Sequence, residues 1–400
     1  MTTVRTQVGI VGAGPAGLLL SHLLARDGIE SIIVEDRSRD HVIDRVRAGV
    51  LEQGTADTMV EAGVGERITR EGMIHDGIEI RFNGRGHRID FPSLTGGKRI
   101  IVYGQNEAMK DMIDARLEAG RPIHFEVEET SVHSFDGDSP VIRFRRNGEG
   151  HEIACDFIAG CDGFHGICRP AFPKGALTGF DRIYPYAWLG ILSESTPPAK
   201  EVAYCHSERG FALLSLRSPT LSRLYVQVDP DEDIANWPDD RIWEELELRS
   251  AVAGGRATIE TGPIVQKAIT PMRSFVAAPM QYGRLFLAGD AAHIVPPTGA
   301  KGMNLAVADV RYLSEAFAAH YRDGDDAGLG GYSERCLRRV WKAQRFSWWM
   351  TTMLHLNAAD SPFDRQRQIA ELDYATSSRA AMTALAENYV GLPFEDVGVQ

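Results

Sequence analysis

The chain has few cysteines, no excess of positive charge and no long apolar run, and each absence excludes a class of protein. Its five cysteines are odd in number and include no Cys-x-x-Cys pair, which argues against a disulfide framework and a zinc site. With 43 basic and 55 acidic residues, the formal net charge of −12 disfavours nucleic acid or an anionic membrane as the main partner. No apolar run approaches the roughly 18 residues of a membrane span.

The start of the chain leaves no room for a signal peptide, because residues 1–5 lead directly into the apolar stretch Val8–Val11. Thiols without an evident pairing scheme fit a reducing compartment, so we expect a cytoplasmic protein. A length of 400 residues with 44% hydrophobic content is typical of a globular chain of two or three domains. Because the sequence contains neither an internal repeat nor a long linker, we expect these domains to be interwoven.

The most informative stretch runs from Gly12 to Gly17, between the apolar strand 8–11 and a helix that continues through Leu18. Glycines at this spacing allow a tight turn and the close approach of a pyrophosphate, to which the helix N-terminus offers N–H donors. A second strand, residues 31–34, ends in Glu35, where an acidic side chain can bind a ribose hydroxyl. The pattern favours a Rossmann-like dinucleotide site over an ordinary strand–turn–helix.

The remaining pattern predicts an α/β fold of mixed α+β character. Short antiparallel strands are expected near residues 76–103, a helix from Leu51, and one strand at 151–159 that leads into Gly160. The expected segments are a first dinucleotide-binding part at 1–180, a β-rich substrate domain at 181–269, a return to the first domain at 270–345 and a helical C-terminal or interface segment at 346–400.

Two neighbouring strands carry a candidate carboxylate clamp. The period of two places Ser215 and Arg217 on one face of a strand, and after a turn it places Arg223 and Tyr225 on the matching face of the next. An arginine flanked by hydroxyls binds a carboxylate through two parallel hydrogen bonds. On pattern alone, a surface salt bridge is the alternative.

Three glycine-marked segments, 12–17, 160–166 and 289–302, each follow a strand and are expected to converge on one extended ligand. In the stretches Arg47–Gly54, Ala159–Gly166 and Gly289–Gly302, the chain resembles the group A flavoprotein aromatic hydroxylases, and the similarity extends from Gln7 to Pro393. The resemblance implies tightly but non-covalently bound FAD, with NADPH or NADH as a transient co-substrate. It further implies hydroxylation of 4-hydroxybenzoate by O2 to 3,4-dihydroxybenzoate, through a flavin C4a-hydroperoxide.

The resemblance also implies a set of FAD contacts. They are Gly12, Gly14 and Gly17 at the pyrophosphate, Glu35 at the adenosine ribose, Asp290 at the ribityl chain, Met303 and Asn304 at the isoalloxazine, and in addition Arg45, Val46, Arg47, Ala48, Gly49, Val50, Gln105 and Asp162. A helix that begins near Asn304 would direct its positive end at the flavin N1–C2=O edge and stabilise the anionic reduced flavin.

For the substrate, the resemblance implies one set of residues for each end of the molecule. Ser215, Arg217 and Tyr225 match the benzoate-carboxylate site, and Arg223 matches an arginine that positions the flavin. The phenol would be bound and deprotonated by Tyr204, Tyr389, the carbonyl of Pro297 and, at the solvent end of a proton relay, His75. A phenol with a pKa near 10 needs such a relay at neutral pH, and its phenolate has a more nucleophilic ring.

The nicotinamide donor has no second fingerprint, and the resemblance implies transient binding by Arg37, His165, Arg169 and Arg273. Because residues 36–41 combine Asp36 with basic side chains, the choice between NADPH and NADH stays open, with NADH or dual use slightly favoured. The family is commonly dimeric, so we expect a homodimer without a metal, nucleic-acid or membrane partner. The alternatives are hydroxylation of another hydroxybenzoate, such as the 3-hydroxy isomer, and a non-hydroxylating flavoprotein carrier or sensor.

Overall fold

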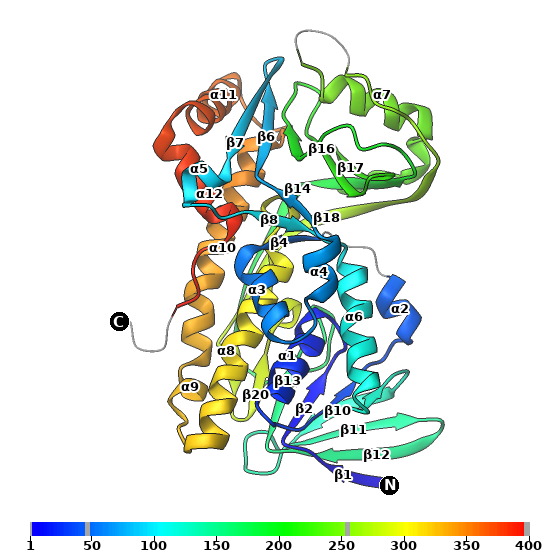
Figure 1. The fold of residues 1–400 in the computed structure, drawn as a ribbon, viewed down its shortest axis with the longest axis vertical. Helices are drawn as coiled ribbons and strands as arrows, with labels where there is room; N and C mark the ends of the chain where they lie inside the picture. The colour runs from blue at the N-terminus through cyan, green and yellow to red at the C-terminus, as the bar shows by residue number, and fades with distance from the viewer. Residues whose placement is uncertain (1, 45–48, 253–256, 396–400) are drawn as a thin grey trace.

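The computed structural model describes residues 2–44, 49–252 and 257–395 (Figure 1). A six-stranded sheet forms its lower part and is parallel except for one edge pair. The strands, in spatial order, are β19 (Gln281–Tyr282), β20 (Leu285–Leu287), β13 (Phe157–Gly160), β2 (Val8–Val11), β3 (Ser31–Val34) and β9 (Ile123–His124). Every residue of β2 and β13 is buried, as expected for a parallel sheet covered on both faces.

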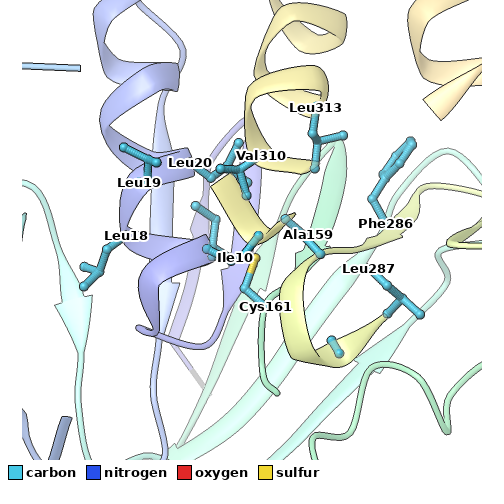
Figure 2. Close-up of a cluster of buried hydrophobic side chains, with 14 of the residues drawn as sticks. Ile10, Leu18, Leu19, Leu20, Ala159, Cys161, Phe286, Leu287, Val310 and Leu313 are labelled. Carbon is cyan, nitrogen blue, oxygen red and sulfur yellow. The ribbon is translucent and has the colours of Figure 1, made fainter. Parts of the chain in front are cut away.

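Two helices, α1 (Pro15–Arg26) and α8 (Gly302–Asp323), pack on one face of this sheet. Figure 2 shows Leu20 of α1 beside Val310 of α8, with Leu313 of the same helix nearby, above Ile10 and Ala159 of the sheet. These side chains are at most 1% exposed. Since burying one large aliphatic side chain stabilises a protein by about 1.5–3 kcal/mol, this cluster holds the glycine turn between β2 and α1 in place.

An eight-stranded sheet forms the upper part, with all neighbours antiparallel except β15 and β6. Its strands, in spatial order, are β21 (His293–Ile294), β18 (Ile264–Ala278), β14 (Thr178–Ser193), β17 (Leu221–Val228), β16 (Ala212–Ser218), β15 (Val202–Cys205), β6 (Gly77–Phe82) and β7 (Arg85–Asp90). The long strands β14 and β18 extend between the two halves (Figure 1). Of the strands expected near 76–103, β6 and β7 therefore share one sheet with those of the β-rich segment.

Two small sheets complete the β structure. One contains β1 (Thr2–Arg5), β12 (Glu149–Ala154), β11 (Val141–Arg146) and β10 (Glu128–His133), and the other contains β4 (Val50–Glu52), β8 (Ile100–Val102) and β5 (Met73–His75). The single strand expected at 151–159 is two strands, because β12 and β13 pair in different sheets. The helix expected from Leu51 begins two residues later, since residues 50–52 pair with β8 as β4.

The remaining helices cover the sheets and form the C-terminal part. They are α2 (Arg39–Asp44), α3 (Gln53–Glu61), α4 (Glu66–Glu71), α5 (Phe91–Thr95), α6 (Gln105–Glu118), α7 (Asp239–Arg249), α9 (Ala327–Gly330), α10 (Tyr332–Leu354), α11 (Pro362–Ser377) and α12 (Arg379–Val390). The long helix α10 runs from the lower half to the upper half (Figure 1). Among the helices described, none combines the length and the apolar character that a membrane crossing requires.

Candidate active site

The three glycine-marked segments converge at the carboxyl ends of β2, β13 and β20, as the sequence predicts. Gly12 has a φ of +104°, and a Cβ there would lie 2.3 Å from the carbonyl oxygen of Cys161, after β13. A Cβ on Gly289, after β20, would lie 3.4 Å from the Cβ of Ala16 in α1. A side chain is therefore excluded at Gly12, and little space remains at Gly289, so the turns present mainly backbone groups at the sheet edge.

The cofactor residues Gly14 and Gly17 shape the start of α1. Gly14 is the N-cap residue of α1, and because it has no side chain it forms no cap hydrogen bond to the first N–H groups of the helix. A Cβ on Gly17 would lie 2.0 Å from the carbonyl oxygen of Gly12, so only glycine allows the helix to start this close to the strand. The helix N-terminus is thereby suited to an anionic pyrophosphate.

Glu35 follows β3 and contacts the glycine turn directly. Its carboxylate accepts hydrogen bonds from the backbone N–H groups of Ala13 at 2.7 Å and Arg37 at 3.0 Å. Burial, together with the neighbouring carboxyl of Asp36, raises the pKa of Glu35 to about 7. A half-buried acid beside the turn fits the ribose-binding position of a dinucleotide.

Asp162 lies between the turns and fits a polar ligand group. Its Oδ2 accepts from the backbone N–H of Cys168 at 2.8 Å, while its Oδ1 is buried and has no partner among the described residues. Burial raises the pKa of this carboxyl. Gly12 is adjacent, since a Cβ there would lie 2.9 Å from the Cα of Asp162. An unpaired buried oxygen beside the glycine turn is what a bound dinucleotide would satisfy.

A buried ion pair between His293 and Asp309 holds the turn that contains Asp290 in place. Asp309 of α8 accepts from the backbone N–H of Gly289 at 2.9 Å and from the Nε2 of His293 at 2.6 Å. Burial opposes a charged imidazole, but the Asp309 carboxylate raises the pKa of His293 overall. His293 thus braces this turn, and Asp290 is held half-buried at the end of β20.

Met303 and Asn304 lie in the first turn of α8, where the helix dipole is positive. The Asn304 side chain donates to the carbonyl oxygens of Ala300 at 2.7 Å and Val50 at 3.1 Å, and it accepts from the backbone N–H of Glu52. Asn304 therefore connects β4 to the helix N-terminus.

Of the other expected cofactor residues, two can be placed by their contacts or by the element to which they belong, and four lie outside the described residues. Gly49 permits close contact with β8, since a Cβ there would lie 2.0 Å from the carbonyl oxygen of Tyr103. Gln105 begins α6 directly after that strand region. Four expected contacts, Arg45, Val46, Arg47 and Ala48, lie outside the described residues.

The expected substrate residues share one face of the eight-stranded sheet. Tyr204 on β15 pairs with Leu213 on β16, Leu213 pairs with Tyr225 on β17, and Tyr225 pairs with Gly190 on β14. Side chains directly opposite one another point to the same face, so these positions form one row. Two inter-strand spacings, roughly 9.6 Å, separate the backbones of Tyr204 and Tyr225. This is the scale of one benzene ring with a polar group at each end.

The residues of the predicted clamp lie at the Tyr225 end of this row, and their role as a clamp stays a prediction. Ser215 pairs with Arg223 in the sheet, and the Nε of Arg223 donates to the Tyr225 hydroxyl at 3.1 Å. Burial would raise the pKa of Tyr225, yet the charges of Arg223 and Arg217 lower it overall. Burial and the like charge of Arg223 lower the pKa of Arg217. Arg217 Nε and Arg223 Nη1 are buried without a partner among the described residues, so the cluster presents unused donors to an anion.

At the other end, the hydroxyl oxygens of Tyr204 and Tyr389 are 2.6 Å apart, although the residues are 185 positions apart. Burial raises the pKa of both hydroxyls, so both are neutral at physiological pH. Tyr204 donates to the carbonyl oxygen of Thr298 at 3.0 Å, rather than to that of Pro297. The Pro297 carbonyl accepts from the backbone N–H of Ala300. The role expected for the Pro297 carbonyl, as a partner of the substrate hydroxyl, stays a prediction.

His75 differs from its expected environment. It ends β5 and is only 3% exposed, so the predicted contact with solvent is wrong. Burial lowers its pKa, against the opposing effect of Glu201 and Asp76, and its Nδ1 has no partner among the described residues. The ring is therefore neutral and has an unused nitrogen, and its place in a relay stays a prediction.

The residues expected to bind the nicotinamide form one cluster, apart from Arg37. The guanidinium groups of Arg169 and Arg273 each lie 4.5 Å from the centre of the Phe164 ring. Exposed His165 contacts the edge of the same ring. Arg273 also forms an ion pair with Asp181. Arg37 is exposed beyond β3, and no contact joins it to this cluster in the part of the chain that the structure describes.

Two features near the substrate residues escape sequence reasoning. A Cβ on Gly190 would lie 3.0 Å from the Tyr225 ring and 3.1 Å from the Arg223 guanidinium, so this glycine makes room for the clamp. The only available signal was a glycine inside an otherwise apolar strand. The second feature is Lys301, which is 4% exposed and pairs with buried Glu52 at 2.6 Å.

Comparison with known proteins agrees with this geometry. Residues 5–347 match the family described as FAD binding domain. The chain is 51% identical over 395 residues to p-hydroxybenzoate hydroxylase of Acinetobacter baylyi, covering 99% of this chain and 97% of the relative. It is 26% identical to a 3-(3-hydroxy-phenyl)propionate/3-hydroxycinnamic acid hydroxylase of Mycobacterium avium, with 78% of this chain and 55% of that protein covered.

Among solved structures, p-nitrophenol 4-monooxygenase from Pseudomonas putida superposes with a TM-score of 0.81 at 21% identity, over 98% of this chain and all of the other. That likeness establishes the fold. The family match and the extent of the 51% identity establish more: the enzyme is a flavin monooxygenase that uses FAD, with NAD(P)H as co-substrate. The chain therefore belongs to the family of FAD-binding aromatic hydroxylases that includes p-hydroxybenzoate hydroxylase.

Proposed function

We propose that this enzyme hydroxylates 4-hydroxybenzoate at C3 to give 3,4-dihydroxybenzoate, with consumption of NAD(P)H and O2. The relative that is 51% identical carries this substrate in its name. The observation that carries the proposal is the row from Tyr204 to Tyr225, which separates a pair of neutral hydroxyls from a cationic cluster by the width of one ring. A para-hydroxylated aromatic acid matches both ends at once.

Each end has a distinct chemical task. Arg217 and the Tyr225 hydroxyl bind the carboxylate, and Ser215 and Arg223 hold them, since the Ser215 Oγ donates to the Arg223 carbonyl at 2.7 Å. For the transfer, the Tyr204 O–H turns from the Thr298 carbonyl to the Tyr389 hydroxyl, 2.6 Å away. The Tyr204 oxygen then accepts the phenol proton and passes its own proton to Tyr389. The unused nitrogen of His75 is the proposed relay terminus. When bound, FAD reduced by NAD(P)H supplies the activated oxygen.

The cofactor contacts and the domain boundaries given above are part of this proposal. The glycine turns, Glu35 and Asp162 would hold the dinucleotide, and the N-terminus of α8 would face the isoalloxazine. The cluster around Phe164 would bind the nicotinamide donor through Arg169 and Arg273.

We also propose that the enzyme is a cytoplasmic homodimer. All five cysteines are buried and unpaired, which fits a reducing compartment. Two tryptophans of α10, Trp341 and Trp348, are 45% and 42% exposed. On strand β14, Phe180 and Ile183 are exposed as well. The rings of Phe180 and Trp341 are 5.4 Å apart, so the two elements form a joint apolar surface that a second copy would cover. Sedimentation analysis tests the dimer.

Steady-state turnover tests the substrate. Purified, FAD-loaded enzyme is given NADPH or NADH with 4-hydroxybenzoate or 3-hydroxybenzoate, and oxygen uptake is compared with the product identified by chromatography. We expect one O2 per 3,4-dihydroxybenzoate formed from the 4-hydroxy isomer. Efficient turnover of the 3-hydroxy isomer alone, or oxygen uptake that yields only peroxide with both, would contradict the proposal.

A further inference from the structure

A buried histidine, His355, lies at the end of α10 against the face of the sheet that carries the substrate residues. It is 1% exposed, and its ring stacks on Phe211 at 4.3 Å and on Tyr186 at 4.8 Å between ring centres. Nothing in the proposed reaction uses it. Its hydrogen bonds nevertheless lead to both ends of the substrate row.

The tautomer of His355 follows from its two neighbours. The Nδ1 lies 2.8 Å from the carbonyl oxygen of Thr351, which can only accept, so Nδ1 carries the proton. The Nε2 is then an acceptor, and the indole N–H of Trp188 donates to it at 2.7 Å. Burial lowers the pKa of His355 to about 3, which keeps this acceptor unprotonated at neutral pH.

Trp188 belongs to the same face of the sheet as the clamp. It is two residues before Gly190 on β14, and it pairs with Gln227, two residues after Tyr225 on β17. Its ring is 4.7 Å from the Tyr225 ring and 5.4 Å from Phe211. The indole is thus the neighbour against which the Tyr225 ring rests, and its orientation affects where the Tyr225 hydroxyl points.

From His355 a second path leads to the phenol end. Thr351, which accepts from the His355 ring, has its Oγ1 2.9 Å from the Oγ1 of Thr298. The carbonyl oxygen of Thr298 in turn accepts from the Tyr204 hydroxyl at 3.0 Å. Hydrogen bonds therefore link these five residues in sequence, from Trp188 through His355, Thr351 and Thr298 to Tyr204. Within Thr351 and Thr298 the connection passes through the residue itself, because the backbone carbonyl bonds one neighbour and the side-chain hydroxyl the other.

We propose that His355 is a positioning residue that sets the distance and orientation between the carboxylate clamp and the tyrosine pair. The inference rests on the proposed function. His355 acts through Trp188 on Tyr225 and through Thr351 on Thr298. Loss of its hydrogen bonds would therefore loosen the fit of a ring-sized acid, although the reacting side chains themselves would all still be present. The expected consequence is weaker substrate binding and hydroxylation less tightly coupled to NAD(P)H oxidation.

Three single variants separate positioning from a general effect of burial. His355→Phe keeps the stacked ring and removes both hydrogen bonds. His355→Gln can restore them, because its amide oxygen accepts from the indole and its amide N–H donates to Thr351. His206→Phe is the control, since His206 is also buried, bonds to the neighbouring Leu354 carbonyl through Nδ1 and has no ring contact with Trp188 in the described structure.

We expect His355→Phe to raise the KM for 4-hydroxybenzoate about tenfold and to increase the peroxide released per NAD(P)H several-fold, with kcat changed less than threefold. His355→Gln should recover most of both losses, and His206→Phe should leave KM within twofold of the wild-type value. The inference is overturned if His355→Phe and His206→Phe shift KM equally, or if His355→Gln is as impaired as His355→Phe.

Trp188→Phe removes the same hydrogen bond from its other end, and it keeps the test decisive if His355→Phe does not fold. Trp188→Phe alone should raise KM in the same direction as His355→Phe, and in a double-mutant cycle the two substitutions together should raise KM no further than His355→Phe alone, because the shared bond is already lost. Additive losses would overturn the inference. Absence of turnover by the wild-type enzyme would instead overturn the proposed function, and the inference with it.

Discussion

The ammonium group of Lys301 and the carboxylate of Glu52 form an ion pair of 2.6 Å in the interior, 249 residues apart in the chain. The second oxygen of Glu52 accepts from Arg339 at 3.2 Å, and Lys301 also donates to the backbone carbonyl of Tyr389. A Cβ on Gly391, where φ is +103°, would lie 2.3 Å from Glu52 Oε2. This ionic cluster thus fixes the backbone at Tyr389 and just after it, and so helps to hold the side chain that faces Tyr204.

Removing the acid from this cluster should destabilise the protein strongly. Glu52→Gln leaves two cations in the interior without their counter-charge, and breaking a buried pair in this way costs about 3–5 kcal/mol. Urea denaturation of the FAD-loaded protein measures the loss. The control Glu66→Gln removes an exposed partner of Arg70 and should cost less than about 1 kcal/mol. Equal losses in the two variants would contradict the importance of the cluster.

Loss of one hydroxyl from the tyrosine pair should impair chemistry more than binding. Tyr204→Phe removes the group 2.6 Å from the Tyr389 hydroxyl, so the phenol loses its route for proton transfer. We expect product formation to fall about a hundredfold or more, the usual contribution of general acid–base catalysis, with the dissociation constant of 4-hydroxybenzoate changed only a few-fold. Product chromatography and a titration of flavin absorbance measure the two quantities.

The matched control for that variant is Tyr184→Phe. Tyr184 is a buried tyrosine on the same sheet whose hydroxyl bonds to Ser274 at 3.0 Å, away from the Tyr204–Tyr389 pair. Its loss should leave hydroxylation within about threefold of the wild-type rate. If Tyr204→Phe weakens substrate binding as much as it slows product formation, the division into a phenol end and a carboxylate end is wrong.

The cationic end should discriminate between an acid and its amide. Arg217→Gln removes a guanidinium with an unused buried N–H, and should weaken the binding of 4-hydroxybenzoate on the order of a hundredfold, as expected for a buried charge pair. Binding of uncharged 4-hydroxybenzamide should change little. Flavin absorbance titrations with both compounds measure the difference. An equal loss for acid and amide would place the carboxylate elsewhere.

The sequence predicted local elements well where one short pattern determines them. The first strand, the glycine turn and Glu35 occur as expected, because the glycine spacing and a four-residue buried strand leave few conformations open. The hairpin register that pairs Ser215 with Arg223 also follows from strand alternation and a short turn.

What the sequence could not predict depends on contacts between distant segments. Residues 151–159 are apolar throughout much of their length, and only pairing with β11 on one side and β2 on the other divides them into two strands. Likewise, His75 is buried because β5 pairs with β8, and Lys301 is buried because Glu52 lies opposite it. The sequence around His75 does not indicate that β8 pairs with β5, and the sequence around Lys301 does not indicate that Glu52 lies beside it.

Because burial lowers the pKa of His355, the protein should become less stable as the pH falls below the normal histidine pKa. Its value is about 3 in the folded state and about 6.5 when unfolded, so between these values the unfolded chain binds one more proton. Stability from this group is therefore complete above pH 6.5 and decreases as the pH falls, by about 1.4 kcal/mol per unit. In urea denaturation from pH 6.5 to 4.5, His355→Gln should lose less stability than the wild type. Parallel pH profiles would contradict a neutral, buried imidazole.

A single methyl group should be enough to disturb the clamp. Gly190 faces Tyr225 across the sheet, and the Cβ introduced by Gly190→Ala would approach the Tyr225 ring to 3.0 Å and the Arg223 guanidinium to 3.1 Å. Because overpacking in a filled site costs about 1–3 kcal/mol, we expect the KM for 4-hydroxybenzoate to rise about tenfold or more. The control Gly330→Ala adds a methyl group in α9 with no atom within 4 Å, and it should leave KM unchanged. If Gly190→Ala also leaves KM unchanged, Tyr225 and Arg223 do not contact the substrate carboxylate end.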